Sequence, residues 1–236
     1  MKVRPVKTNV FTEGGDLTAF ILRHIKKVDE GSVIVVTSKI VALAEGRTRI
    51  AKTEKEKVAI IKSESEFMLK TKYVYLTVKD GTVIANAGVD ESNADGDGKI
   101  ILLPKDSYEA TRVLRNQLMK HYGVKKLGVL ITDSRIMPLR AGVVGVALGY
   151  AGFKGLRDYR GTKDIFGRKL KFTQTDVADA LATSAVLVMG EGKECIPLAL
   201  ITDAPVTFTN TVSPNELRID PKEDMYGPFF AQKRKK

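Results

Sequence analysis

The sequence has little cysteine and little histidine. Its 236 residues include one cysteine, Cys195, and two histidines, His24 and His121. One thiol forms no disulfide within the chain, and a lone cysteine is typical of a reducing compartment. The two histidines show no spacing signature of a Cys–His nucleophile or of a zinc site, so neither kind of site is favoured. We therefore expect Cys195 to be a small buried apolar residue.

Long apolar runs are absent as well. No uninterrupted apolar stretch reaches the roughly 18 residues that predict a membrane span. The first residues, MKVRPVKTNVF, contain no apolar core of signal-peptide length. Because the hydrophobic content of 43% and the charged content of 28% are ordinary for globular proteins, we expect a soluble, cytoplasmic protein with no membrane partner.

Positive charge is in excess, at a formal net charge of +11. Part of that excess comes from the basic tail KRKK at 233–236. A basic balance attracts nucleic acids, phosphates and acidic metabolites alike and does not choose between them. The sequence has no zinc-finger, homeodomain or RNA-recognition signature. Charge is therefore the only feature that supports a nucleic-acid-binding module, and we predict no specific nucleic-acid partner.

Helix and strand patterns alternate along the chain, which predicts a mixed α/β fold. Asp-Gly at 80–81 separates two β-rich runs, YVYLTV and TVIANAG, and predicts a hairpin. The predicted helices cover 16–28, 53–70, 106–121 and 175–189, and the predicted strands include 3–11, 32–38, 126–134 and 196–202. No internal repeat or linker divides the chain. We predict one domain over 1–205, with two subdomains allowed, and a C-terminal extension over 206–236.

Glycine is concentrated in the segment AGVVGVALGYAGFKGL at 141–156, which holds five glycines. Such a density disfavours a helix interior. It indicates strands that bend or that pack closely against another part of the protein.

Polar residues follow three apolar elements at the point where each ends. Asp90 and Asn93 follow the strand TVIANAG, in the segment NAGVDESNADGDG. Asp133 and Ser134 close the strand KLGVLIT, and Glu191 follows the helix that ends at 189–190. Ligand-binding groups collect at the ends of elements on a rigid scaffold.

Such a set of oxygen ligands suits phosphate chemistry with Mg²⁺ or Mn²⁺. These metals use one or two carboxylates and leave other positions to water and nucleotide phosphates. Glycines beside the acids let backbone N–H groups approach phosphate. Lys39, Arg47 and Arg140 are the candidate cations for charge outside the metal shell.

Each of these points also has a simpler explanation. Asp90 and Asn93 are typical of a solvated turn, and Asp133 with Ser134 is typical of a cap. Glu191, like Lys39 and Arg47, is by itself typical of a solvated surface charge. Because the chain has neither a Walker sequence nor a calcium-loop pattern, spacing alone gives only a general metal-and-phosphate hypothesis.

Several long motifs, in order and in register, resemble the γ-glutamyl ligases of the deazaflavin coenzyme F-420 pathway, the CofE family. The resemblance extends from about residue 8 to about residue 202 and is carried by TSKIVALAEGR (37–47), NAGVDESNADG (86–96), ITDS (131–134), GVVGVALGYAG (142–152), DYRGTKDIFGRKL (158–170) and VADALATSAVLVMGEG (177–192). It implies a mixed α/β (α+β) fold with mixed and antiparallel sheets flanked by helices, and a homodimer.

The resemblance also implies an activity. Such enzymes join the amine of L-glutamate to a substrate carboxylate through an acyl phosphate, using GTP and a divalent metal, Mg²⁺ or Mn²⁺. ATP in place of GTP stays open. Metal and cations would stabilise charge on the γ-phosphoryl group while the site aligns carboxylate, phosphate and amine.

Residue by residue, the resemblance gives a set of expected roles. Asp90 and Asp133 match metal aspartates, Ser134 stands where a threonine is usual near the second metal, and Glu191 matches the last metal segment. The expected catalytic residues are Asp90, Asp133 and Arg140, and the expected metal ligands are Asp90, Asp133, Ser134 and Glu191. The expected nucleotide contacts are Asn9, Val10, Ser38, Lys39, Asn93, Met189, Gly190, Glu191 and Gly192.

The sequence departs from the family's pattern around the anion-binding cations. Met137 and Ala141 occupy positions where basic residues are usual, and Leu43 occupies the position of a common nucleotide-contacting lysine. Loss of arginine contacts is not a conservative change, because a guanidinium binds phosphate with two hydrogen bonds. Arg135 is a candidate replacement for the missing cations, from a shifted position. The segment that matches the family's N-terminal nucleotide loop, residues 7–11, reads KTNVF and also departs from the pattern.

Two other hypotheses stay open beside this one. A γ-glutamyl ligase with a different acceptor, such as a folate, would share the metal ligands and differ in the altered cations. A non-catalytic relative that binds nucleotide or metal is favoured by the lost cations and disfavoured by the intact acids.

Overall fold

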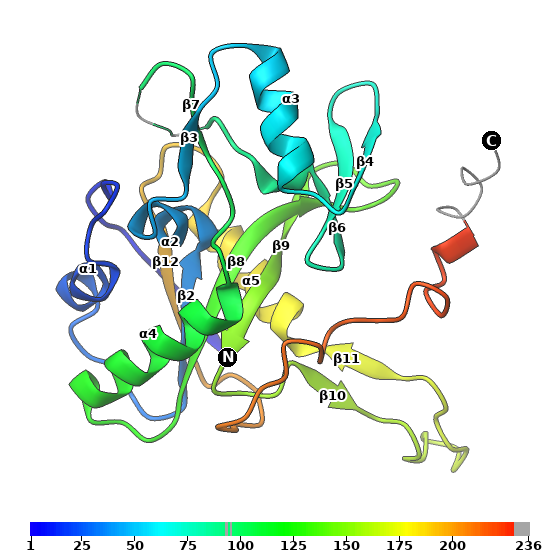
Figure 1. The fold of residues 1–236 in the computed structure, drawn as a ribbon. Helices are drawn as coiled ribbons and strands as arrows, with labels where there is room; N and C mark the ends of the chain where they lie inside the picture. The colour runs from blue at the N-terminus through cyan, green and yellow to red at the C-terminus, as the bar shows by residue number, and fades with distance from the viewer. Residues whose placement is uncertain (93, 95, 229–236) are drawn as a thin grey trace.

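A five-stranded sheet organises the computed structural model, which describes residues 1–92, 94 and 96–228 (Figure 1). Its strand order is β1-β12-β2-β8-β9, and within it only β2 and β8 run parallel. Smaller sheets are β3-β7, β4-β5-β6 and β10-β11. The mixed α/β class with mixed and antiparallel sheets is confirmed. Asn93 and the basic tail lie outside the described residues.

The elements in chain order are β1 (Lys2–Val6), α1 (Leu17–His24), β2 (Ser32–Thr37), α2 (Ser38–Ala44), β3 (Thr48–Ile50), α3 (Glu54–Ser63), β4 (Phe67–Lys70), β5 (Tyr75–Lys79), β6 (Thr82–Ala85), the 3₁₀ turn η1 (Asn86–Gly88), β7 (Lys99–Ile101), α4 (Ser107–Tyr122), β8 (Leu127–Ile136), β9 (Val143–Ala151), β10 (Leu156–Asp158), β11 (Gln174–Asp176), α5 (Val177–Met189) and β12 (Leu198–Thr202). Among the described residues, no helix combines the length and the apolarity needed to cross a bilayer.

Helices cover both faces of the five-stranded sheet (Figure 1). Helices α1, α2 and α4 pack on one face, against side chains such as Ile34 and Ile131. Helix α5 packs on the other face, against Val35 and Leu130. Strand β2 and the first half of β8, Leu127–Ile131, are buried and mostly apolar on both faces, as expected for strands that are covered from two sides.

Local sequence signals set the starts of the helices. The side chains of Asp16, Asp106 and Asp176 each accept a hydrogen bond of 2.9 Å from a backbone N–H in the first turn of α1, α4 and α5. Thr53 and Glu56 form a reciprocal capping box at the start of α3. These caps satisfy N–H groups that a helix cannot pair by itself.

The glycines of β9 lie where helices touch the strand from either side. A Cβ atom on Gly145 would lie 2.5 Å from the carbonyl oxygen of Ala182 in α5. A Cβ atom on Gly149 would lie 2.5 Å from the backbone carbon of Ser107, at the start of α4. The expectation that this segment packs closely against another part of the protein is therefore confirmed, because a side chain at Gly145 or Gly149 would push α5 or α4 away from the strand.

The predicted helix over 53–70 is wrong beyond Ser63. Residues Phe67–Lys70 form β4, which pairs with β5 in antiparallel register. The apolar spacing of Phe67 and Met68 continues the helical period, but pairing with β5 decides the conformation. The helix predicted over 16–28 also ends early, at His24.

The C-terminal segment after 205 is partly integrated into the domain. The side chains of Val206, Phe208 and Leu217 pack against the core on the α5 side of the sheet. A carboxylate oxygen of Glu216 accepts hydrogen bonds from the Tyr150 hydroxyl at 2.6 Å and from the Gly155 N–H at 2.9 Å. The chain up to about 218 is therefore held by the same core as the preceding residues.

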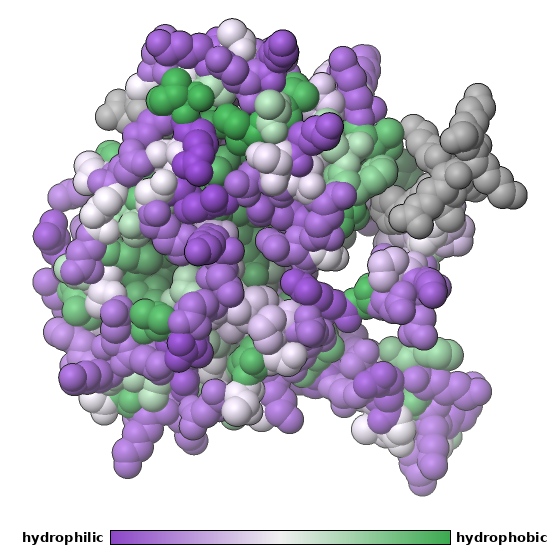
Figure 2. Space-filling view, in the orientation of Figure 1, coloured by the Kyte–Doolittle hydropathy of each residue, from purple (hydrophilic) through white to green (hydrophobic). Residues whose placement is uncertain are grey.

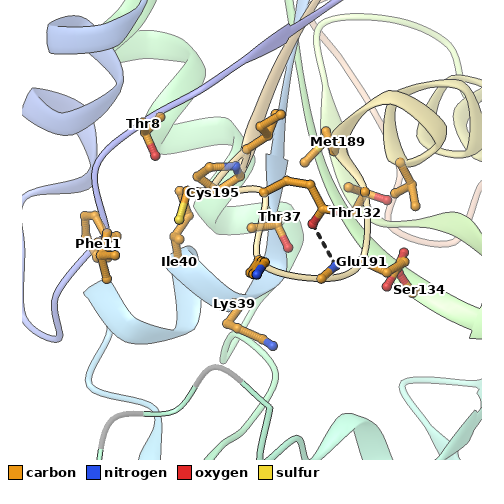
Figure 3. A pocket seen from close by; sticks show the side chains of 18 of the residues that line it. Thr8, Phe11, Thr37, Lys39, Ile40, Thr132, Ser134, Met189, Glu191 and Cys195 are labelled. Carbon is orange, nitrogen blue, oxygen red and sulfur yellow. Dashed lines mark hydrogen bonds between the residues drawn. The ribbon is translucent and has the colours of Figure 1, made fainter.

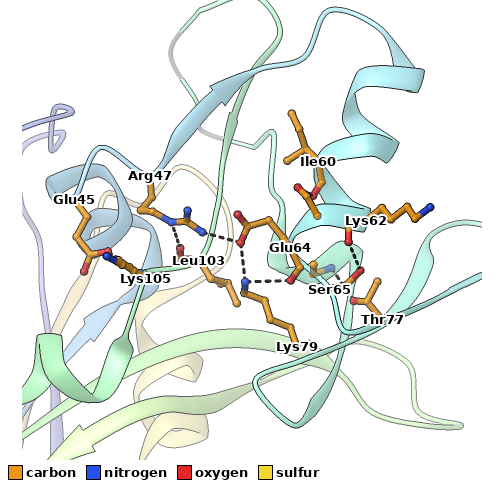
Figure 4. Close-up of polar contacts among 12 residues, drawn as sticks. Glu45, Arg47, Ile60, Lys62, Glu64, Ser65, Thr77, Lys79, Leu103 and Lys105 are labelled. Carbon is orange, nitrogen blue, oxygen red and sulfur yellow. Dashed lines mark hydrogen bonds and ion pairs between the residues drawn. The ribbon is translucent and has the colours of Figure 1, made fainter.

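An ion-pair cluster joins the α3 and hairpin segments to the rest of the protein (Figure 4). One carboxylate oxygen of Glu64 lies 2.7 Å from both the Arg47 guanidinium and the Lys79 ammonium. The Arg47 guanidinium also donates to the carbonyl of Leu103 at 3.0 Å. Arg47 was a candidate phosphate cation, and the structure instead places it in this cluster, away from the acids of the predicted site.

Burial acts to raise the pKa of Glu64, but the hydrogen bonds and charges of Lys79 and Arg47 outweigh it, so the pKa lies below its ordinary value. A carboxyl with a lowered folded pKa contributes stability above its unfolded pKa of about 4.3. That contribution is lost as the pH falls through the folded pKa.

We predict that Glu64→Gln lowers the free energy of unfolding by about 1–3 kcal/mol at pH 7, because two half-buried cations lose their shared carboxylate. Urea denaturation at a series of pH values measures this loss, which should shrink below about pH 4. Glu54→Gln, at an exposed position of α3, is the control and should change stability by less than about 0.5 kcal/mol. A loss that stays constant down to pH 3 would contradict the charge-based explanation.

Candidate active site

The parallel pairing of β2 with β8 brings two chain segments to one edge of the sheet. Thr37 ends β2 and pairs with Thr132 in β8. The carboxyl ends of parallel strands meet at the same edge, and ligands in α/β proteins bind at such edges. Helix α2 follows β2 at once, so Ser38 and Lys39 lie beside Asp133 and Ser134 of β8.

A cavity of about 510 Å³ opens at this edge (Figure 3). Its walls come from the loop after β1, the start of α2, the end of β8 and the loop that connects α5 with β12. The volume lies within the range of about 300–1,000 Å³ typical of small-molecule sites. Its lining includes Thr8, Asn9, Val10, Phe11, Thr37, Lys39, Ile40, Leu43, Thr132, Asp133, Ser134, Met189, Gly190, Glu191, Gly192, Glu194 and Cys195.

Asp133 is held by its neighbours in β8, directly after the last residue that pairs with β2. Its carboxylate accepts a hydrogen bond of 3.1 Å from the Ser38 hydroxyl. Burial raises the pKa of Asp133, and the negative charge of Asp90 adds to that effect, while the Arg135 charge and hydrogen bonds from Ser38 and Ser134 act against it. A buried carboxylate with a raised pKa is one for which a cation would be a strong partner.

The pKa of Asp90 is shifted in the opposite direction to that of Asp133. Its carboxylate lies 2.7 Å from the Lys39 ammonium and accepts hydrogen bonds of 2.7 Å and 2.9 Å from the N–H and hydroxyl of Ser92. Burial acts to raise the pKa of Asp90, but Lys39 and Ser92 outweigh it and the pKa lies below its ordinary value. Asp90 therefore stays ionised, with Lys39 as its counterion.

Glu191 joins the same edge through Ser134. The Ser134 hydroxyl donates a hydrogen bond of 2.6 Å to the carboxylate of Glu191, which follows α5. Figure 3 shows Ser134 and Glu191 close to each other among the residues that line the cavity, with Lys39 below them. Two hydroxyl contacts and one ion pair thus connect four segments of the chain, through Ser38–Asp133, Ser134–Glu191 and Lys39–Asp90.

The fit to a divalent metal rests on the chemistry of these donors. Within the described ranges, no three acidic, histidine or cysteine side chains gather closely enough to hold a metal ion by themselves. Asp90 and Asp133 are close enough for the charge of one to raise the pKa of the other. Two carboxylates with a neighbouring hydroxyl match the way Mg²⁺ binds when phosphate and water supply the remaining ligands.

The predicted site residues fall into four groups. Asn9, Val10, Lys39, Asp133, Ser134, Met189, Gly190, Glu191 and Gly192 line the cavity, while Asp90 and Ser38 support it through Lys39 and Asp133. Arg140 is exposed and does not line the cavity. Its backbone N–H donates to the carbonyl of Met137. Asn93 lies outside the described residues.

Other residues of the cavity were missing from the sequence-based set. Thr37 ends β2, and Thr132 is the last residue of β8 that pairs with it, so the carboxyl end of the parallel pairing is the signal that would have found them. Glu194 shapes the loop after α5, because its carboxylate accepts the Gly192 N–H at 2.8 Å. The expectation of a buried Cys195 is wrong. Its thiol is exposed at the cavity wall, since the loop backbone there is left-handed and holds the Thr8 N–H through its carbonyl.

Comparison with known proteins gives the family. The sequence profile described as F420-0:Gamma-glutamyl ligase matches residues 5–203. The chain belongs to this family. A coenzyme F420:L-glutamate ligase of Methanopyrus kandleri is 34% identical, over 96% of this chain and 97% of that protein. The ligases of the same name from Methanocaldococcus jannaschii and Methanococcus maripaludis are 38% and 42% identical, over 90% and 73% of this chain and 84% and 69% of those proteins.

We predict that Asp133→Asn stabilises the protein while leaving the fold intact. A carboxyl with a raised folded pKa loses stability as the pH rises from its unfolded pKa through its folded pKa. The amide keeps the oxygen that accepts from Ser38 and removes the charge, so the free energy of unfolding should rise by about 1–2 kcal/mol at pH 8.

Urea denaturation without added metal, at a series of pH values from about 4 to 8, measures the effect, which should grow as the pH rises above the unfolded pKa of about 3.9. Asp29→Asn changes an exposed carboxylate in the same way and should shift stability by less than about 0.5 kcal/mol. A destabilised Asp133→Asn protein would contradict the burial argument.

Proposed function

We propose that this chain joins the amine of L-glutamate to the carboxylate of an F420-type acceptor, with GTP as the energy source and Mg²⁺ or Mn²⁺ as cofactor. The family match over nearly the whole chain supports the glutamate ligase activity. The observation that carries the chemistry is that Asp133, Ser134 and Glu191 line one cavity at the carboxyl edge of the β2–β8 pairing, with Asp90 joined to that edge through its ion pair with Lys39.

The chemistry proceeds in two steps. An oxygen of the acceptor carboxylate attacks the γ-phosphorus, the bond to the bridging oxygen breaks, and the nucleoside diphosphate leaves. The glutamate nitrogen then attacks the acyl carbon, the bond to the phosphate oxygen breaks, and inorganic phosphate leaves as the amine gives up a proton. A divalent metal would neutralise charge on the phosphoryl oxygens when bound.

The chain's own residues supply position and charge. Asp133, Asp90, Ser134 and Glu191 would hold the metal, of which Asp133 is already buried and anchored by Ser38. Lys39 lines the same cavity, forms an ion pair with Asp90 and suits contact with a phosphate oxygen. The residues that line the rest of the cavity would enclose the nucleotide and exclude water.

The activity is tested by nucleotide-dependent phosphate release with L-glutamate and an acceptor. We predict that Asp133→Asn lowers kcat by about a thousandfold or more, because an uncharged amide is a poor metal ligand. Asp29→Asn is the matched control and should keep full activity. An unchanged kcat in Asp133→Asn would remove Asp133 from the reaction.

The same assay decides the finer points. GTP and ATP are compared at equal concentration, and a coenzyme F-420 precursor is compared with a folate as acceptor. Turnover with the folate alone would assign a different acceptor, and nucleotide binding without turnover on either would identify a non-catalytic relative.

We also propose a homodimer, which is supported by the β10–β11 hairpin. This hairpin projects from the body of the protein (Figures 1 and 2). Its loop exposes three large apolar side chains, Ile165 at 92%, Phe166 at 75% and Phe172 at 88%. Large apolar side chains gathered on a projecting segment are typical of a protein–protein contact.

Light scattering after size-exclusion chromatography tests the dimer. The unsubstituted protein should have twice the chain mass of 25.9 kDa. We predict that Phe166→Ser combined with Phe172→Ser yields monomer, since the two aromatic rings are the largest apolar groups of the loop. Tyr73→Ser, which is 83% exposed elsewhere, is the control and should stay dimeric. A monomeric unsubstituted protein would refute the proposal.

A further inference from the structure

A second cavity, of about 280 Å³, is lined by Arg135 of β8. Asp133 faces the first cavity and Arg135, two residues further along β8, lines the second. The tip of the β5–β6 hairpin, the start of α4, part of β9 and the segment at 214–218 complete the wall. The volume is just below the range of about 300–1,000 Å³ typical of sites for larger ligands, so it suits a molecule of amino-acid size.

The second cavity carries charges of both signs. Its cations are Lys79, Lys105, Arg135 and Arg218, and its carboxylates are Asp80, Asp106 and Asp179. Within the described residues, Lys105, Arg135 and Arg218 have no carboxylate oxygen within 4.0 Å. These cations are thus available to a ligand, whereas Lys79 is held by Glu64 (Figure 4).

Arg135 carries an unused hydrogen-bond donor. Its Nη1 donates to the carbonyl of Val83 at 3.2 Å, while its buried Nε has no acceptor among the described residues. A buried donor without an acceptor costs free energy, which a ligand oxygen would recover. The guanidinium of Arg218 lies over the hairpin turn, where a Cβ atom on Gly81 would be 3.6 Å from its Nε.

Two of the carboxylates already have structural partners. Asp106 caps α4 through the Glu109 N–H, and Asp179 accepts the Ala147 N–H at 2.8 Å. Each still presents acceptor capacity, since a carboxylate has two oxygens. The cavity therefore offers donors for carboxylates and acceptors for an ammonium group in one small volume.

We propose that this second cavity is the binding site for L-glutamate, an inference that rests on the proposed function. L-glutamate carries two carboxylates and one ammonium group, which match the unpaired cations and the acidic side chains of the cavity. Arg135 follows Asp133 by two residues in β8, so an amino acid bound beside Arg135 would lie near the phosphate chemistry proposed at Asp133. The anionic acceptor is the other source of a carboxylate, and the test separates the two.

The experiment measures steady-state constants for each substrate with Arg218→Gln and Arg135→Gln. Both substitutions should raise the KM for L-glutamate by roughly tenfold to a hundredfold, the usual effect of losing a hydrogen bond to a charged group. The KM values for nucleotide and acceptor should stay within about twofold. Arg23→Gln, on α1, is the matched control and should leave all three constants unchanged. Arg218 is exposed, so its substitution should fold even where Arg135→Gln does not.

Equilibrium dialysis with L-glutamate alone, on the unsubstituted protein and on Arg218→Gln, is the second arm. Tenfold weaker binding in the variant supports the assignment. An unchanged KM and unchanged binding in Arg218→Gln would overturn it, and so would a rise in the acceptor KM instead. If the unsubstituted protein releases no phosphate, the proposed function fails and the dialysis result alone decides on the cavity. In that case, absent or equal binding overturns the inference.

Discussion

The parallel pairing of β2 with β8 is the constraint on which the site depends. It places the residues after Thr37 beside those after Thr132, although 95 positions separate the hydrogen-bonded partners Ser38 and Asp133. The strands are buried on both faces, so their register cannot slip without moving apolar side chains out of the core. The relative positions of Ser38 and Asp133 are therefore fixed by the register of the sheet.

The packing of β9 supports this arrangement from the other side of β8. Helices α4 and α5 touch the strand at Gly149 and Gly145, on opposite faces, where any side chain would hold them apart. This close approach sets where α4 begins and how closely the second half of α5 packs on β9. The first of these points borders the smaller cavity, and the second leads into the loop of Glu191. One glycine-rich strand thus positions parts of both cavities.

Sequence patterns predicted what is encoded locally. The aspartate caps of α1, α4 and α5, the Asp-Gly turn at 80–81 and the buried strands follow from short-range signals. The fold class and the position of most cavity residues at element ends were also predictable. Phe67–Lys70 was misread, because pairing with β5 is a long-range contact that helical spacing does not reveal.

Other features depend on contacts that no local pattern encodes. Arg47 resembles a free cation in the sequence, and only the fold brings it to Glu64 and Lys79. Arg140 is near Asp133 along the chain, yet it lies past the end of β8 and is exposed. A lone cysteine such as Cys195 is typical of a buried core position, but the left-handed backbone of its loop exposes its side chain to the larger cavity.

That position of Cys195 has a practical consequence. It is the sole thiol of the chain, and it stands exposed in the wall of the larger cavity. A maleimide or a fluorophore would therefore label one defined position without any engineering of the sequence. The rate of alkylation should fall when a ligand occupies the cavity, because the ligand shields the sulfur from the reagent.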